Sequence, residues 1–97
     1  VGPLVDIGDP FDVDDMDGVP GVYVLYDVSE RPVYVGQSKD ILHRIKQHES
    51  KKWFIKKFID TASYIEVEEE SLRRRIESIL ISFLKSNAVL NKKGVDR

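Results

Sequence analysis

The chain has 97 residues, of which 41% are apolar and 33% charged, with a net charge of −2 and no cysteine. These values predict one small globular domain, and they exclude disulfides, cysteine zinc sites and a membrane span of roughly 18 apolar residues. Residues 1–17 lack the regions of a signal peptide. We therefore expect a cytoplasmic protein, or a nuclear one in a eukaryote, without a membrane partner. Because the chain opens with valine, we expect further domains in a longer chain.

Residues 1–18 mix Pro, Gly and Asp without a sustained period, and we interpret them as an acidic, partly irregular leader. Residues 1–30 hold eight carboxylates and no lysine or arginine, whereas residues 31–97 hold all fifteen basic residues against nine acids. Two interpretations stay open. The basic part could contact nucleic-acid phosphates, or the split could be that of a solvated surface with a polar leader.

The remaining pattern predicts an α+β domain over residues 19–97. Two strands rich in Val and Tyr, at 21–27 and 32–37, form a β-hairpin, and a third strand follows at 63–68. Helices are expected at 40–48, 50–59 and about 71–86. The order ββααβα predicts a small three-stranded antiparallel sheet flanked by helices.

Two tyrosines of the hairpin are the first candidate site residues. The even-length loop between their strands predicts that Tyr23 and Tyr34 face each other directly, although a bulge would shift this register. A single strand tyrosine is usually only a good strand former. Gly36 is a weak strand former, so we expect something to approach its face closely.

Polar residues flank the apolar stripes of two predicted helices. Arg44 and His48 are four residues apart, so they project from neighbouring turns of one face. Glu77 lies beside the stripe of the last helix. Its structural alternative, an ion pair with Arg73 or Arg74, has the less favourable orientation.

A second group of residues is a candidate surface for nucleic acid. Trp53 falls among lysines on the predicted helix at 50–59, as in a surface that stacks bases and contacts phosphates. The alternative is that Trp53 packs beneath another element. The nucleic-acid-binding candidates are Lys39, Lys52, Trp53 and Lys56.

Together these residues resemble the GIY-YIG nuclease superfamily over about residues 18–95. The sequence has GVY at 21–23, YVG at 34–36 and QSKDILHRIKQH at 37–48, followed by Glu77 and by Asn91 within VLN. Valine replaces isoleucine in both name motifs, and Asp40 stands where asparagine is common. Neither departure removes a functional atom.

The resemblance implies a DNA endonuclease that hydrolyses a phosphodiester bond with water and one divalent cation, Mg²⁺ or Mn²⁺. It implies that Glu77 binds the metal, Arg44 binds phosphate, and His48 accepts a proton. Tyr23 is the expected base, its pKa lowered by the neighbouring cations, and Tyr34 holds the water or phosphate; the reverse assignment stays open.

Gly36 and Asn91 are implied as supporting residues, and all the catalytic side chains are expected to converge on one hollow. The alternative function is a catalytically degenerate copy of the fold that binds nucleic acid or a protein partner.

Overall fold

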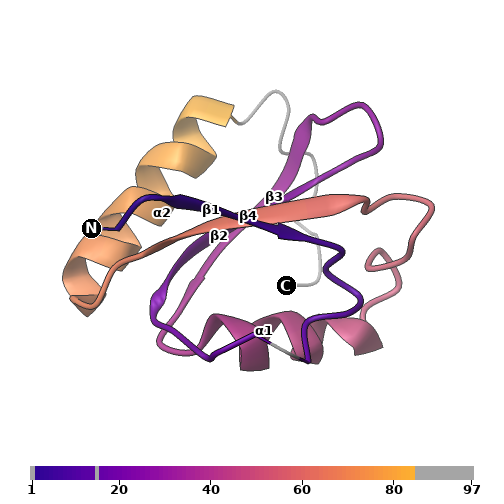
Figure 1. Ribbon diagram of the computed structural model, residues 1–97. Coiled ribbons are helices and arrows are strands. Elements are labelled where there is room, and N and C mark those ends of the chain that lie inside the picture. Colours follow the sequence, from indigo (N-terminus) through magenta and orange to yellow (C-terminus); the bar gives the residue numbers. More distant parts are fainter. Residues whose placement is uncertain (1, 15, 85–97) are drawn as a thin grey trace.

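The computed structural model describes residues 2–14 and 16–84, and it shows an antiparallel sheet with helices on both faces (Figure 1). The predicted α+β class is confirmed. The sheet has four strands in the order β1-β4-β2-β3. The strands are β1 (Leu4–Gly8), β2 (Gly21–Tyr26), β3 (Pro32–Ser38) and β4 (Thr61–Glu66). The helical elements are α1 (Ile41–Gln47), the short 3₁₀ helix η1 (His48–Ser50) and α2 (Glu70–Leu84).

The expected three-stranded sheet is wrong, because the N-terminal segment contributes β1. This strand pairs with β4, with Val5 opposite Tyr64, and a register shift follows Asp6. Beyond β1, Val13 is buried in the core and the ring of Phe11 lies 4.5 Å from that of Phe54. A five-residue strand carries too little alternation to be recognised without its partner.

The expected helix at 50–59 is also wrong. Only residues 48–50 form a 3₁₀ turn, and isolated turns follow, such as the hydrogen bond from the Phe58 amide to the Ile55 carbonyl. Trp53, Phe54 and Ile59 are buried from this irregular chain. Aromatic and β-branched residues favour helices only weakly, so packing decides their conformation here.

The two faces of the sheet carry separate apolar clusters. The face that packs against α1, here called the α1 face, carries Tyr23, Leu25 and Tyr34. The opposite α2 face carries Val22 and Val35, which pack against apolar residues of α2. Strand side chains alternate between faces, so consecutive residues of β2 and β3 serve different cores.

Helix α1 begins at a side-chain cap. The Asp40 Oδ1 accepts a hydrogen bond from the His43 amide at 3.1 Å, which satisfies one of the unpaired donors of the first turn. Ile41 and Ile45 are fully buried and fix the helix against the sheet. The cap and these two anchors thereby orient Arg44 and His48. Within the described part of the chain, no helix has the length and apolar content needed to cross a bilayer.

Candidate active site

The register of β2 and β3 positions the two tyrosines. Tyr23 pairs with Gly36 and Tyr34 pairs with Leu25, and a register shift lies between Leu25 and Tyr26. The prediction that the tyrosines face each other directly is therefore wrong, because the hairpin register places Gly36, two residues beyond Tyr34, opposite Tyr23. They are diagonal neighbours on the α1 face, with stacked rings whose centroids lie 6.1 Å apart.

Gly36 provides space for the ring of Tyr23. A Cβ added at Gly36 would lie 2.5 Å from both Cζ and the hydroxyl oxygen of Tyr23. The close approach expected at this glycine thus comes from Tyr23 itself. Because β3 is an edge strand, the Tyr23 hydroxyl lies at the margin of the sheet.

The Tyr23 hydroxyl is hydrogen bonded to His48. The distance between Oη and Nε2 is 2.6 Å, and both residues, like Tyr34, are 0% exposed. His48 follows the last residue of α1, and its ring also lies edge-on to Tyr34 with centroids 5.0 Å apart. The sequence spacing brought Arg44 and His48 to one face, but only the folded chain joins His48 to Tyr23.

Burial raises the pKa of the Tyr23 hydroxyl well above its usual value, and Tyr34 adds to the rise, whereas Arg44 opposes it. Arg44 by itself does not produce the expected lowering, because desolvation of the phenolate outweighs the attraction of its guanidinium. With its pKa raised, Tyr23 stays protonated, and the hydrogen bond between its Oη and the His48 Nε2 provides a short path for a proton between the two side chains.

Arg44 links this buried cluster to the surface. Its guanidinium favours the ionised form of Tyr23 and so opposes the rise of the Tyr23 pKa, and its Nη1 donates to the Gln47 Oε1 at 3.3 Å. Gln47 in turn lies 3.2 Å from the His43 ring nitrogen. The sequence did not identify Gln47 as a site residue, although it follows Arg44 by three residues, a spacing at which helical side chains are neighbours.

Glu77 lies on α2, the helix that packs against the α2 face of the sheet. It follows Arg73 by one turn, and the Arg73 guanidinium donates to Gln37 of β3 and to the backbone carbonyls of Val67 and Glu68. Leu80 and Leu84, further along α2, line a hollow with residues at the Pro32 end of β3. The helix thus runs along β3, and Glu77 is level with about Val35.

The expectation that these side chains converge on one hollow stays a prediction. The phenols, His48 and Arg44 belong to the α1 side, whereas Glu77 sits half-buried on the α2 side of the same edge strand. Both arginines considered as ion-pair partners of Glu77 have partners of their own. Arg73 donates to Gln37 and to two backbone carbonyls, and Arg74 lies 3.6 Å from Glu70. Any site that includes Glu77 must extend around the edge of β3.

The donor set limits which metal ion fits. Among the described residues, no three His, Cys, Asp or Glu side chains form a cluster able to hold a metal. A single carboxylate such as Glu77 does not suit zinc, which takes three or four protein ligands. It suits a hard cation that keeps several of its waters, as Mg²⁺ does.

Trp53 does not form an exposed stacking surface. It is only 9% exposed, and its ring stacks on Tyr34 with centroids 4.9 Å apart. The prediction that Trp53 binds nucleic acid is contradicted, and the alternative that it packs beneath another element is confirmed. The tryptophan instead supports the wall of the tyrosine cluster. Lys39, Lys52 and Lys56 are exposed, so their role stays a prediction, and Asn91 lies outside the described residues.

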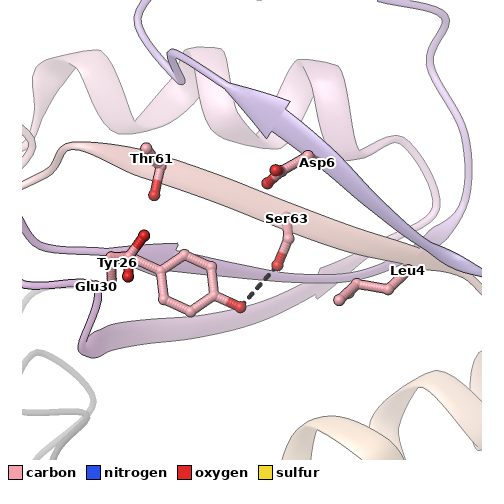
Figure 2. Close-up of a pocket in the computed structure, with 6 residues that line it drawn as sticks. All are labelled: Leu4, Asp6, Tyr26, Glu30, Thr61 and Ser63. Carbon is pink, nitrogen blue, oxygen red and sulfur yellow. Dashed lines mark hydrogen bonds between the residues drawn. The ribbon is translucent and has the colours of Figure 1, made fainter.

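A separate hollow lies at the other end of the sheet, near β1 (Figure 2). Its volume is about 330 Å³, and the Tyr26 hydroxyl in it is hydrogen bonded to Ser63 at 2.8 Å. Asp6 and Glu30 contribute carboxylates, which repel phosphate. It is not continuous with the tyrosine cluster, because Ser63 pairs with Val24 and thus faces the α2 side.

Comparisons with known proteins identify the family and the fold. A family model described as the GIY-YIG catalytic domain matches residues 19–88. The fold is similar to that of the GIY-YIG N-terminal endonuclease domain of UvrC from Thermotoga maritima. A point mutant bound to its catalytic divalent cation has a TM-score of 0.69 and 19% identity, covering 86% of this chain and 96% of that one. The magnesium-bound domain has a TM-score of 0.66 and 21% identity, covering 78% and 90%. No curated protein sequence gives a significant match.

Proposed function

The chain belongs to the GIY-YIG family of catalytic domains, and from this we propose that it is a metal-dependent DNA endonuclease using water as the nucleophile. One observation carries the proposal: the 2.6 Å hydrogen bond between Tyr23 and His48, with Arg44 between this pair and the surface. A buried proton donor and acceptor next to a phosphate-binding cation are the parts that hydrolysis of a phosphodiester needs.

Arg44 is the proposed phosphate ligand. Its planar guanidinium can donate two parallel hydrogen bonds to phosphate oxygens, and Gln47 limits its rotation. A lysine would offer a point charge without this fork. Arg44 therefore holds the scissile phosphate above the Tyr23 hydroxyl.

Tyr23 and His48 form the proposed proton relay. As the water oxygen bonds to phosphorus and the leaving oxygen departs, the water proton passes to Tyr23 Oη, whose own proton passes to His48 Nε2. The step leaves a neutral phenol, an imidazolium and the departing oxygen as an anion, which takes a proton from solvent. Because no free phenolate forms, the raised pKa of Tyr23 does not block the reaction.

Glu77 is the proposed ligand of a divalent cation, Mg²⁺ or Mn²⁺, at the edge of β3. Such an ion neutralises charge on the phosphate and lowers the pKa of a bound water. Tyr34 packs between Tyr23 and Trp53 and holds the phenol in place. In the reverse assignment Tyr34 is the base, and separate Tyr23→Phe and Tyr34→Phe variants distinguish the two.

The second candidate function is DNA binding without cleavage. The observation that favours it is the complete burial of Tyr23, Tyr34 and His48, because a relay must reach water when substrate binds. In that case the hydrogen bond is a structural pair in the core, and Arg44 alone contacts phosphate.

The deciding experiment incubates the chain with plasmid, nicked and branched DNA in Mg²⁺ or Mn²⁺. We expect strand cleavage, its loss in Arg44→Gln, and its retention in the charge-matched control Arg75→Gln on α2. Salt-dependent binding without cleavage of any substrate would favour the second candidate. Equal cleavage by both arginine variants would show that Arg44 is not part of the active site.

A further inference from the structure

The C-terminal end of α1 and η1 form a second charged surface next to Arg44. A shallow groove of about 600 Å³ is lined by Arg44, Lys46, Gln47, Glu49, Ser50 and Lys51. Three cations face one carboxylate there. Arg44 lies at the point where this groove meets the buried tyrosine cluster. A strand of DNA whose scissile phosphate rests on Arg44 would continue over Lys46 and Lys51.

The acidic N-terminal segment reaches the same groove. Asp14 Oδ1 lies 2.7 Å from the Lys46 Nζ, and this contact raises the pKa of Lys46. The contact is held in place from below, since Val13 is only 4% exposed within the α1-face core. The carboxylate itself is exposed: the Asp14 side chain is 77% accessible and that of Lys46 is 43%.

We propose that this groove binds a non-scissile DNA phosphate through Lys46 and Lys51, and that Asp14 competes with that phosphate for Lys46. The inference rests on the proposed DNA substrate. An exposed ion pair is weak, so a phosphate can displace Asp14 by a rotation of two side chains while Val13 stays buried. Asp14 thus lowers the affinity of the groove for any anion that does not also bind to Arg44.

The chemistry favours phosphate over a carboxylate ligand. Lysine ammonium groups bind phosphate as point charges, and each phosphate contact releases a condensed counterion from DNA. Glu49 offsets one of the three cations, and Asp14 offsets a second. The three cations and two carboxylates leave the groove at about +1, and the departure of Asp14 raises this to about +2, so an approaching polyanion is bound more strongly once it has displaced Asp14.

The test measures binding of a short fluorescent DNA duplex to the full chain at several salt concentrations, without divalent cations so that no strand is cut. We expect Lys46→Gln and Lys51→Gln each to reduce the slope of log affinity against log salt by about 0.9. Asp14→Asn should tighten binding by about two- to fivefold at low salt. In a Lys46→Gln background it should have no effect, since the competition requires the lysine.

Two matched variants control for charge alone. Arg75→Gln removes a cation on α2, and Asp12→Asn removes an exposed carboxylate of the same N-terminal segment. The inference is overturned if Lys46→Gln behaves like Arg75→Gln, or if Asp14→Asn binds no more tightly than Asp12→Asn. If those results accompany normal cleavage, the proposed endonuclease function still stands. If the slopes are as expected but the chain cuts no DNA in the separate assay with Mg²⁺ or Mn²⁺, the groove is supported and the endonuclease is contradicted. Undetectable DNA binding contradicts both.

Discussion

The ring of Tyr23 lies across Gly36, so close that a Cβ at Gly36 would come within 2.5 Å of the phenol oxygen. The absence of a side chain at one position of β3 therefore decides where a hydroxyl from β2 can lie. That place is 2.6 Å from the His48 ring. The glycine is thus part of the geometry that joins the tyrosine to its proton acceptor.

The first prediction concerns this contact. Gly36→Ala should lower the free energy of unfolding by about 1–3 kcal/mol, because the new methyl displaces the ring. In a Tyr23→Ala background the same substitution should cost less, and urea unfolding of the four variants measures the difference. Gly8→Ala is the control for this dependence: no atom lies within 4 Å of its would-be Cβ, so the backbone strain at its φ of 77° should cost the same in both Tyr23 backgrounds. An equal cost of Gly36→Ala in both backgrounds would show that Tyr23 does not occupy the space.

The second prediction separates catalysis from folding. Tyr23→Phe should reduce cleavage by about 10²-fold or more, because the proton relay loses its middle member. It should also cost about 1–3 kcal/mol of stability, since Nε2 of His48 is left without its donor. Tyr64→Phe, opposite Tyr23 on β4, is the matched control for cleavage rates. Were both variants to cut DNA equally fast, the base would not be Tyr23.

The third prediction is a loss of stability in alkali. Below about pH 10 the Tyr23 hydroxyl is protonated in both the folded and the unfolded chain, so its stabilising contribution is fully present. Above that pH only the unfolded chain loses this proton, because burial raises the folded pKa. The free energy of unfolding should then fall by about 1.4 kcal/mol per pH unit until the folded pKa is reached.

The measurement for this effect is urea unfolding of the wild type and of Tyr23→Phe between pH 8 and 11. The difference between the two proteins removes the titration of lysines, including Lys46. We expect that difference to be constant below about pH 10 and to shrink above it. A constant difference throughout would mean that Tyr23 ionises as readily in the folded chain as in the unfolded one.

The fourth prediction uses the single tryptophan of the chain. Because Trp53 is buried against Tyr34, its fluorescence should be protected from iodide in the folded protein and exposed by urea. Addition of DNA should leave this protection unchanged, since no base can stack on the ring. Trp53→Ala should cost about 3–5 kcal/mol. Strong quenching of this fluorescence by DNA would show that Trp53 contacts the nucleic acid.

Local patterns were enough to predict the hairpin, the helix that starts after Asp40 and the long helix that carries Glu77. Each of these depends on neighbours within a few residues, such as the cap from Asp40 to the His43 amide. The family resemblance rested on the same short motifs, and the match over residues 19–88 confirms it. Gly36 could be identified as a point of close approach, although the identity of its neighbour could not.

The failed predictions share one physical origin. Strand β1 is defined by its pairing with β4, Trp53 is buried by contacts with Tyr34, and Phe54 of the expected helix at 50–59 packs on Phe11. All three depend on residues far apart in the chain, whose free energies of contact exceed local propensities.

The sequence by itself determined which chemical groups this protein carries and which short elements hold them. Only the tertiary structure decided how they meet: the register of β2 and β3 put Tyr23 over Gly36, and burial kept its proton on the phenol. Register and desolvation are properties of the assembled sheet and core, because each is the sum of many contacts that no local stretch of residues contains.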